Sequence, residues 1–326
     1  MERLDFSLKG EKVLITGATG FIGSHLTRRL LKEGTEIHIL IKKDSNIYRI
    51  KDIIENLAVW QGDVQDYPSL YYCIKKSNPR IIFHLATLRN VTRNMKLIEP
   101  MIDINIKGTL NIFRGLIENK TRIKCFINTG TCEEYGGAPA PFYESQREMP
   151  VSPYSASKVA ATYFCQMISK TINLPIIILR PFLTYGPFQD TDMFIPSLIN
   201  HCLCGKDFPM TEGNQTRDFI YVDDIVDAYL LAATFPNAIG EIINIGSGIE
   251  YRIKDVAKKI VNMMGKSIRL LLGALPKRPG ETSHFFCDNE KAKRLLNWSP
   301  RVNLDEGLEK TIRWYKDQFK NKSEHV

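Results

Sequence analysis

Residues 12–23 read Lys12-Val13-Leu14-Ile15-Thr16-Gly17-Ala18-Thr19-Gly20-Phe21-Ile22-Gly23, and this stretch decides the fold of the chain. Its first five residues form an apolar run typical of a buried strand, and Leu26, Leu30 and Leu31 follow with helical spacing. The three glycines permit a tight turn, the approach of a pyrophosphate to backbone N–H groups, and close packing of helix on strand. A glycine turn in this context indicates a dinucleotide-binding site, with a purely structural turn as the alternative.

Apolar runs and helical patterns alternate after this turn. The runs expected to form strands are residues 36–41, 57–60, 80–86, 123–128 and 175–180, and the helical patterns cover residues 100–118 and a helix that begins at Pro153. Regular alternation of this kind predicts an α/β fold with a doubly wound, parallel, Rossmann-like sheet. In such a sheet, ligands gather at the carboxyl ends of the strands.

Beyond Arg180 the chain becomes richer in Gly, Pro and polar loops, and its elements become shorter. Helical patterns remain near residues 193–204, 223–234, 252–264 and 304–319, with one apolar run at 242–245. We therefore expect a dinucleotide-binding Rossmann domain over residues 1–180. Residues 181–326 are expected to form mainly a smaller C-terminal α+β lobe for the substrate, with some segments returning to the Rossmann core.

The composition is that of an ordinary globular protein, with 44% hydrophobic and 25% charged residues. The formal charge of +8 suits an anionic partner such as a nucleotide, but the Lys and Arg residues are scattered, so no nucleic-acid partner is expected. We find no signal-peptide core and no apolar run of the ~20 residues that a membrane span needs, which predicts a cytoplasmic protein with no membrane partner. Seven cysteines without a C-x-x-C pair predict neither a structural metal nor disulfides.

The end of the second expected strand bears on the choice of cofactor. NAD-binding sites commonly place an acid here, which bonds the ribose 2′-hydroxyl. In this chain Lys42 and Lys43 follow Ile41, and Asp44 comes only after them. Two cations would suit a 2′-phosphate, so NADP is favoured over NAD; the alternative is that both lysines are solvated loop residues. The residues expected to contact the cofactor are Gly17, Thr19, Gly20, Phe21, Ile22, Gly23, Lys42, Lys43, Asp63, Val64, Leu85, Ala86, Thr87, Thr129, Tyr154, Lys158 and Pro181.

A second informative stretch is Ser152-Pro153-Tyr154-Ser155-Ala156-Ser157-Lys158. Ser152 is a favourable N-cap, and Pro153 suits the first position of a helix. Tyr154 and Lys158 then lie four residues apart on one helix face. A neighbouring ammonium lowers the pKa of a phenol from about 10 toward the range useful for moving a proton. Taken alone, such a pair would be typical of a solvated helix surface.

Five motifs in order along the chain carry a family resemblance. They are Gly17-x-x-Gly20-x-x-Gly23, Tyr154-x-x-x-Lys158, Arg180-Pro181, Tyr185-Gly186-Pro187, and Arg217-Asp218-Phe219-Ile220-Tyr221-Val222-Asp223-Asp224. Over residues 12–316 the chain resembles the extended short-chain dehydrogenases/reductases of the nucleotide-sugar epimerase/dehydratase type. The resemblance implies an NAD(P)-dependent enzyme that exchanges a hydride at C4 of a nucleoside-diphosphate sugar. It also implies a homodimer formed through the helices expected at 100–118 and 153–171.

The resemblance assigns roles to the residues that match the family motifs. Tyr154 would be the acid/base at the C4 oxygen, and Lys158 would lower its pKa and hold the nicotinamide ribose. Thr131 would hydrogen-bond the same oxygen, because two donors stabilise a developing alkoxide better than one. Asn105 matches an asparagine that orders the site, although an ordinary polar helix position is the alternative.

For the substrate, the family motifs point to arginines in the C-terminal half. Arg217 and Arg278 would clamp the substrate diphosphate, because guanidinium groups bond phosphate oxygens bidentately.

Thr131-Cys132-Glu133 bears on the reaction type. Dehydratases of the resembled family carry Thr-Asp-Glu or Thr-Ser-Glu here, and a glutamate can remove the C5 proton once C4 is a ketone. Cys132 would then assist departure of the C6 hydroxyl. This motif favours a sugar-nucleotide dehydratase of the 4,6 or 5,6 type, with a loop carboxylate of no chemical role as the alternative for Glu133.

Other functions stay open at this stage. Lys42 and Lys43 would suit an NADPH-dependent nucleotide-sugar 4-ketoreductase, and a C4 epimerase would need neither these lysines nor Glu133. A cofactor-binding regulatory protein is the alternative outside enzymes. Such proteins usually lack the Tyr or the Lys of the pair, and this chain has both.

Overall fold

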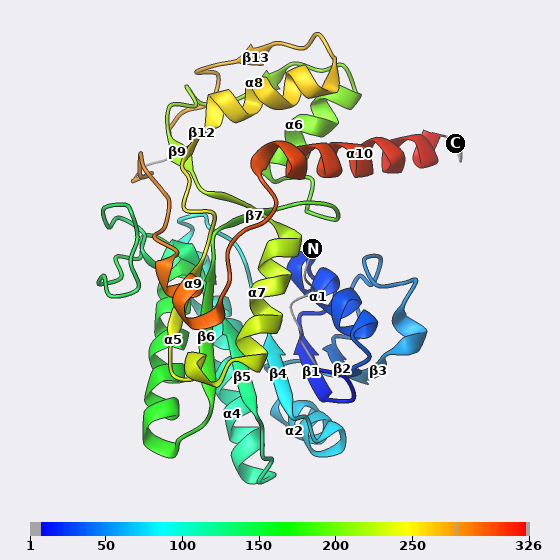
Figure 1. Ribbon diagram of the computed structural model, residues 1–326, viewed down its shortest axis with the longest axis vertical. Helices are drawn as coiled ribbons and strands as arrows, with labels where there is room; N and C mark the ends of the chain where they lie inside the picture. Colours follow the sequence, from blue (N-terminus) through cyan, green and yellow to red (C-terminus); the bar gives the residue numbers. More distant parts are fainter. Residues whose placement is uncertain (1–7, 278–279, 324–326) are drawn as a thin grey trace.

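A seven-stranded parallel sheet forms the centre of the protein (Figure 1). The computed structural model describes residues 8–277 and 280–323, with side chains described as far as Lys320. The strand order is β11-β6-β5-β4-β1-β2-β3, and each neighbouring pair is parallel. The strands are β1 (Lys12–Thr16), β2 (Glu36–Ile41), β3 (Ala58–Gln61), β4 (Ile81–His84), β5 (Cys125–Thr129), β6 (Ile176–Pro181) and β11 (Ile242–Ile245).

Helices cover both faces of this sheet. Val13 and Ile15 of β1 belong to one core cluster, which includes side chains of α1 (Phe21–Lys32) and α7 (Val222–Thr234). Leu14 belongs to another cluster, on the face covered by α2 (Tyr67–Ser77), α4 (Gly108–Glu118) and α5 (Pro153–Ile172). Successive strand residues point to opposite faces, so one apolar run serves both layers. The predicted doubly wound, Rossmann-like fold is confirmed.

The strand order reverses at β1, which lies between β2 and β4. Ligands of open α/β sheets bind in the crevice beyond the carboxyl ends of the strands at such a point. The loops after β1 and β4 approach closely here, because a Cβ built on Gly17 would lie 2.6 Å from the backbone nitrogen of Ala86. The topology therefore directs the predicted cofactor residues of both loops to one place.

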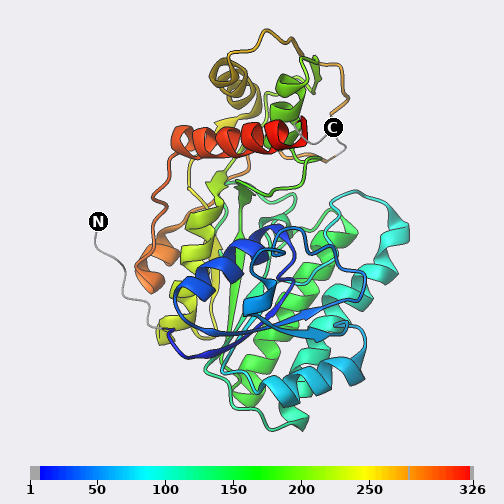
Figure 2. The same cartoon turned by 90° about the vertical axis from the view of Figure 1, so that its right-hand side faces the viewer.

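A smaller lobe with its own core lies beyond that edge of the sheet (Figures 1 and 2). Leu198, Ile260 and Leu308 are fully buried in it and come from three different helices. Its helices are α6 (Phe194–Leu203), α8 (Ile253–Met264) and α10 (Leu304–Ser323). Its short strands are β7 (Leu183–Tyr185), β8 (Phe208–Pro209), β9 (Thr216–Arg217), β10 (Phe219–Tyr221), β12 (Tyr251–Arg252) and β13 (Leu270–Leu271).

Parts of the C-terminal half pack against the sheet rather than in the lobe. The strand at 242–245 has the predicted bounds, and as β11 it pairs with β6 at the edge of the sheet. α7 packs on α1, and α9 (Glu290–Leu296) packs on β11. How the chain divides into functional domains stays a prediction.

Three helical regions differ from the sequence prediction, and one of them is α9, which was not predicted. α2 was not predicted; it has a proline at its start, a position that proline favours. The helix predicted over 100–118 consists of α3 (Ile98–Met101), a π-helical segment η3 (Ile102–Lys107) and α4. π-Helical turns occur frequently at functional sites. The short 3₁₀ turns are η1 (Ile54–Asn56), η2 (Met95–Leu97), η4 (Cys132–Glu134) and η5 (Pro236–Ala238).

Within the described residues, no helix has both the length and the apolar character required to cross a membrane.

Candidate active site

The glycine turn after β1 leaves room for a phosphate. A Cβ on Gly23 would lie 2.1 Å from the Gly17 carbonyl oxygen, so this packing excludes any side chain. A Cβ on Gly20 would meet nothing closer than 3.2 Å. Gly20 is the N-cap of α1, and no side chain caps this helix. The first backbone N–H groups of α1 therefore lack intrahelical partners and face the crevice, which fits the pyrophosphate of a dinucleotide.

The predicted ribose contacts lie at the end of β2. Lys42 Nζ is 2.9 Å from Asp63 Oδ2, so one of the two cations already has an acidic partner. Burial raises the pKa of Asp63, but the Gln65 N–H and the Lys42 ammonium outweigh this effect and hold the pKa below its usual value. Lys43 is exposed. The site at this corner thus combines an ionised carboxylate with an exposed ammonium.

The other predicted cofactor residues lie along the carboxyl edge of the sheet. Leu85, Ala86 and Thr87 follow β4 directly, and Pro181 ends β6. Thr129 ends β5, and its hydroxyl lies 2.7 Å from the hydroxyl of Tyr229 on α7. On the far side of the crevice, the Val64 carbonyl accepts a hydrogen bond from Asn111 Nδ2 at 2.9 Å.

Tyr154 and Lys158 are buried, with 5% and 3% of their surface exposed, so they do not form a solvated surface pair. Ser152 caps α5 as predicted, and its side chain accepts a hydrogen bond from the Ser155 N–H. Burial raises the pKa of Tyr154, and the hydrogen bond with Thr131 lowers it only in part. This direction is opposite to the one expected from the Lys158 spacing, because removal of the phenol from water outweighs the neighbouring charges.

Asn105 lies in the π-helical segment and joins two parts of the site. Its Oδ1 accepts hydrogen bonds from the Thr87 hydroxyl at 2.9 Å and from the Leu88 N–H at 2.8 Å. Its Nδ2 donates to the Ser157 hydroxyl on α5 at 2.9 Å. These contacts tie the loop after β4 to the helix that carries Tyr154, which fits an ordering role.

Thr131, Cys132 and Glu133 lie in the loop and 3₁₀ turn that follow β5. The Thr131 hydroxyl accepts a hydrogen bond from the Glu133 N–H at 3.2 Å and also bonds the phenol of Tyr154. After burial, the charge of Glu133 also contributes to the raised pKa of Tyr154, so this carboxylate lies within electrostatic range of the phenol. Cys132 is 4% exposed, and burial, together with the Glu133 charge, raises the pKa of its thiol. The thiol therefore stays protonated at neutral pH.

The two arginines predicted to bind substrate have different outcomes. Arg217, at the end of β9, forms an ion pair with Glu281 at 2.5 Å and donates to the carbonyl oxygens of Thr216 and Thr282. A phosphate at this position would share the guanidinium with Glu281. Arg278 lies outside the described residues.

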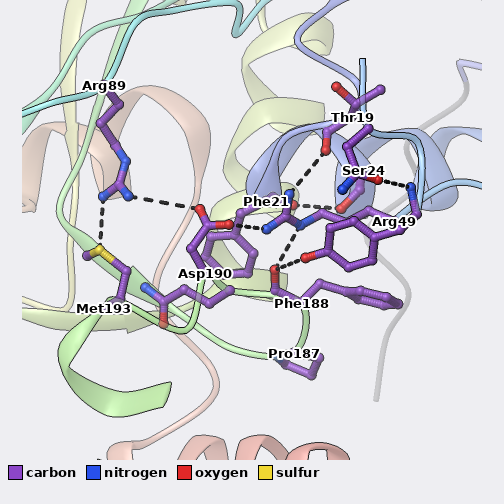
Figure 3. A network of polar contacts seen from close by, with 12 residues as sticks. Thr19, Phe21, Ser24, Arg49, Arg89, Pro187, Phe188, Asp190 and Met193 are labelled. Atoms are coloured by element: carbon purple, nitrogen blue, oxygen red, sulfur yellow. Dashed lines mark hydrogen bonds and ion pairs between the residues drawn. The ribbon is translucent and has the colours of Figure 1, made fainter. Parts of the chain in front are cut away.

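A polar network around Asp190 was not predicted (Figure 3). Arg49 Nη2 donates to Asp190 Oδ1 at 2.5 Å, and Arg49 Nε donates to the Phe188 carbonyl oxygen at 2.8 Å. Arg49 Nη1 lies 3.4 Å from the carbonyl oxygen of Thr19 in the glycine turn. From the other side, Arg89 Nη2 lies 3.9 Å from Asp190 Oδ2. This network joins the segment after β7 to both cofactor loops.

A parallel sheet with a glycine turn at its switch point, and a buried Tyr–Lys pair on the helix beyond β5, defines a short-chain dehydrogenase/reductase. The family model described as GDP-mannose 4,6 dehydratase matches residues 14–311. The chain therefore belongs to this family of extended short-chain dehydrogenases/reductases, whose members are nucleotide-sugar dehydratases and epimerases, and it is an enzyme of that type.

Individual relatives include both kinds of enzyme. A dTDP-glucose 4,6-dehydratase of Haemophilus influenzae is 30% identical over 330 residues, which cover 93% of this chain and 97% of that protein. A trifunctional UDP-glucose 4,6-dehydratase of Arabidopsis thaliana is 29% identical over 322 residues, which are 95% of this chain but 48% of that longer protein. The solved UDP-glucuronic acid 4-epimerase of Bacillus cereus, in complex with UDP-glucuronic acid and NAD, superimposes with a TM-score of 0.85 at 30% identity, covering 94% and 99% of the two chains.

Proposed function

We propose that this protein is a nucleoside-diphosphate-sugar dehydratase of the 4,6 or 5,6 type. The observation that carries the proposal is the position of Glu133. This carboxylate lies in the turn after β5, close enough to Tyr154 for its charge to raise the pKa of the phenol. A base beside the C4 acid/base is what proton removal from C5 requires. The dehydratases among the relatives support the same assignment.

In the proposed mechanism the residues act on successive positions of the sugar. A bound nicotinamide cofactor, held by the glycine turn and Lys158, would supply reversible hydride transfer. Tyr154, as the phenolate that the Lys158 ammonium would stabilise, takes the proton of the C4 hydroxyl, and Thr131 hydrogen-bonds the same oxygen.

Once C4 is a ketone, Glu133 removes the acidified C5 proton. The C6 hydroxyl then leaves as water after it receives a proton from Cys132, and this elimination forms a double bond between C5 and C6. The hydride would then return to the sugar, at C6 together with the Glu133 proton at C5 in the 4,6 type, or at C4 in the 5,6 type, and solvent reprotonates the Cys132 thiolate. Cys132 is only 4% exposed, so the elimination requires the C6 hydroxyl of the bound sugar to contact the thiol from the crevice.

For the cofactor we propose NADP, with NAD as the alternative. Lys42 and Lys43 are both exposed at the end of β2, and Lys42 pairs with Asp63. We expect the purified protein to bind NADP more tightly than NAD, and Lys43→Ala to reduce this preference. Equilibrium titrations with each cofactor measure it, and tighter binding of NAD by the unmodified protein would contradict the proposal. The complex of the Bacillus cereus epimerase with NAD favours the alternative.

Two other reactions remain as alternatives. An NADPH-dependent 4-ketoreductase is favoured by Lys43 and requires no base at C5. A C4 epimerase is favoured by the likeness to the Bacillus cereus enzyme. Both leave Glu133 without a chemical role.

Mass analysis of the products separates the reactions. The purified protein is incubated with UDP-, GDP-, CDP- and dTDP-hexoses, and with their 4-keto derivatives plus NADPH. Loss of water supports the dehydratase, and unchanged mass with altered stereochemistry supports the epimerase. Gain of two hydrogens supports the reductase. Absence of any product from the whole panel would contradict the proposed enzyme class.

The remaining predictions concern substrate, assembly and location. We propose that the lobe holds the nucleotide sugar and that Arg217 contacts its diphosphate. We also propose a homodimer through α4 and α5, because exposed apolar side chains gather on α3–α5. These residues are Ile98, Ile102, Ile117, Tyr163, Phe164, Met167 and Ile172.

Sedimentation equilibrium tests the proposed homodimer. We expect the wild-type protein to be a dimer and Phe164→Asp to shift the equilibrium toward monomer. A monomeric wild-type protein would contradict the proposal. A cytoplasmic location is proposed from the sequence.

A further inference from the structure

Arg180 lies at 0% exposure within the apolar strand β6. A buried guanidinium requires acidic partners, because water no longer solvates its charge. Arg180 has two: its Nη2 donates to Glu134 Oε2 at 2.7 Å and to Glu148 Oε1 at 2.6 Å. It also lies over the ring of Tyr135, 4.7 Å from the centroid. The three charged side chains form one buried cluster beneath the loop that carries Thr131.

The two acids of this cluster have different surroundings. Glu134 is fully buried, and its Oε1 accepts the Thr131 backbone N–H at 2.9 Å. Its Oε2 accepts a hydrogen bond from the hydroxyl of Thr162 at 2.9 Å, and Thr162 lies on α5 one turn beyond Lys158 in the chain direction. Glu148 accepts hydrogen bonds from the Arg180 guanidinium and from the exposed hydroxyl of Tyr163. Glu134 thus bonds both the loop that carries Thr131 and helix α5, whereas Glu148 bonds α5 through Tyr163 and does not hold Thr131.

The charge of Glu134 also acts on Lys158. Lys158 is 3% exposed, and burial lowers the pKa of its ammonium. The negative charge of Glu134 opposes this shift. Since Lys158 must carry a proton to stabilise a phenolate at Tyr154, a buried anion nearby serves the same chemistry as the hydrogen bonds.

We infer that Glu134 is a positioning residue, whose carboxylate holds Thr131 and helix α5 in the relative geometry that brings Thr131, Tyr154 and Lys158 to one substrate oxygen. This role rests on the proposed function, because it is defined by chemistry at that oxygen. Glu134 itself touches no substrate. A displacement of about 1 Å between reacting groups is enough to lower a rate about 10²-fold.

The test compares Glu134→Gln with Glu148→Gln, a matched control that removes the same charge from the same arginine. Both variants lower the midpoint of thermal unfolding. For Glu134→Gln we expect kcat to fall about 10- to 100-fold, with KM for the nucleotide sugar within about twofold of the wild type. For Glu148→Gln we expect kcat to stay within about threefold of the wild type. Equal effects of the two substitutions on kcat, or no effect of Glu134→Gln, overturn the inference.

A pH profile gives a reading that a purely structural role would not change. Loss of the Glu134 charge lowers the pKa of Lys158, so the alkaline limb of kcat moves to lower pH in Glu134→Gln and not in Glu148→Gln. If the alkaline limb of the kcat profile does not move in Glu134→Gln, the charge of Glu134 does not support the protonation of Lys158. The titratable or charged groups that face Tyr154 and Lys158 in the described residues are Cys132, Glu133, Arg89, His84, Glu134, Cys165 and Tyr229.

Two further measurements keep the inference testable. If Glu134→Gln does not fold, Thr162→Val decides: it removes one hydrogen bond to Glu134, and an unchanged kcat overturns the inference. Amide hydrogen exchange at Thr131 needs no turnover, and it should be faster in Glu134→Gln but not in Glu148→Gln. Absence of turnover by the wild-type protein contradicts the proposed function, whereas equal exchange at Thr131 in both variants contradicts the positioning role.

Discussion

At the residue scale, Glu133 and Tyr154 share one corner of the site but carry out different proton transfers in the proposed mechanism. For Glu133→Gln, formation of the dehydrated product is expected to fall about 10²- to 10⁴-fold, because the amide cannot accept the C5 proton. Tyr154 and Thr131 are unchanged in this variant, so oxidation at C4 should continue. Mass analysis measures the loss of water, and absorbance at 340 nm after substrate addition measures reduction of the bound cofactor.

Tyr154→Phe is the matched control for this experiment. It removes the hydroxyl that acts at C4, so both the absorbance change and the loss of water should disappear while the nucleotide sugar still binds. Unimpaired dehydration by Glu133→Gln would show that this residue is a loop carboxylate without a chemical role. The proposed mechanism would then lose its base at C5.

At the element scale, the glycine turn between β1 and α1 uses two of its glycines differently. Gly23→Ala would place a Cβ 2.1 Å from the Gly17 carbonyl oxygen, so the turn must shift, and we expect a loss of about 1–3 kcal/mol in unfolding free energy. Gly20→Ala meets only a 3.2 Å contact and should leave the stability nearly unchanged. It should weaken cofactor binding roughly tenfold or more, because the methyl group occupies the path of the pyrophosphate.

Urea unfolding and cofactor titration of both variants separate the two effects. Equal stability of Gly23→Ala and the wild type would contradict the packing argument. Cofactor binding by Gly20→Ala at wild-type strength would contradict the placement of the pyrophosphate at α1.

A second element-scale feature is the junction of β1, β4 and α4 at His84. His84 Nδ1 lies 2.6 Å from the Thr16 hydroxyl, and its Nε2 lies 3.0 Å from the Thr109 hydroxyl. The Thr109 hydroxyl donates its proton to the Asn105 carbonyl oxygen at 2.8 Å. It must therefore accept from Nε2–H, which leaves Nδ1 as the acceptor for Thr16. A neutral imidazole satisfies this chain of hydrogen bonds, and a protonated one breaks it at Thr16.

This arrangement predicts acid sensitivity. Burial, together with the Lys158 charge, lowers the pKa of His84 to about 3, from 6.5 in the unfolded chain. Between pH 6.5 and 3 the unfolded chain binds a proton at His84 that the folded protein does not bind. The unfolding free energy is therefore highest above pH 6.5 and falls as the pH falls toward 3, by up to ~1.4 kcal/mol per pH unit. His84→Gln has no such titration, so its unfolding free energy should depend less on pH between 6.5 and 4. Urea unfolding at several pH values checks this, and parallel curves for both proteins would refute it.

At the scale of the whole molecule, local pattern predicted the sheet well and side-chain partnerships poorly. β2 and β11 have the predicted bounds because each is a short, continuous apolar run between polar residues. The place of β11 beside β6 depends on tertiary packing, which no local pattern contains. A signal was present for the cluster around Arg180, because an arginine within an apolar strand requires a buried acid. Its partner Glu134 directly follows the Thr131-Cys132-Glu133 motif, but no local pattern marks it as that acid.

Burial accounts for the other differences at this scale. The spacing of Tyr154 and Lys158 predicted their shared helix and, from charge alone, a lowered pKa for the phenol. The structure gives the opposite direction, because the extent of desolvation depends on layers contributed by distant segments. Similarly, Arg49 follows β2 as an ordinary polar residue in the sequence. Its contacts with Thr19 and Asp190, which are 30 and 141 residues away in the sequence, arise only in the folded chain.

The lobe and the sheet are joined at the start of the segment that leaves β7. His25 on α1 lies 2.9 Å from the Pro187 carbonyl oxygen through Nε2, and Arg49 bonds both Phe188 and Asp190. Arg49 is largely buried, whereas Asp190 is half exposed. The guanidinium therefore depends on this pairing more than the carboxylate does. Because Arg49 also reaches the Thr19 carbonyl oxygen, it connects this segment to the glycine turn.

Asp190→Asn is expected to loosen this connection without disturbing the sheet. It should lower the unfolding free energy by about 1–3 kcal/mol, because the buried side of Arg49 loses a charged acceptor. Amide hydrogen exchange should quicken at residues 45–50 and 187–193 and stay unchanged in β1, β4 and β5. The control is Asp52→Asn, which removes an exposed carboxylate that pairs with Arg28 and leaves the Arg49–Asp190 pair intact; the Arg28 guanidinium itself lies over the ring of Phe188. Quickened exchange at 187–193 in Asp52→Asn, or unchanged exchange there in Asp190→Asn, would show that the lobe is held to the cofactor site by other contacts.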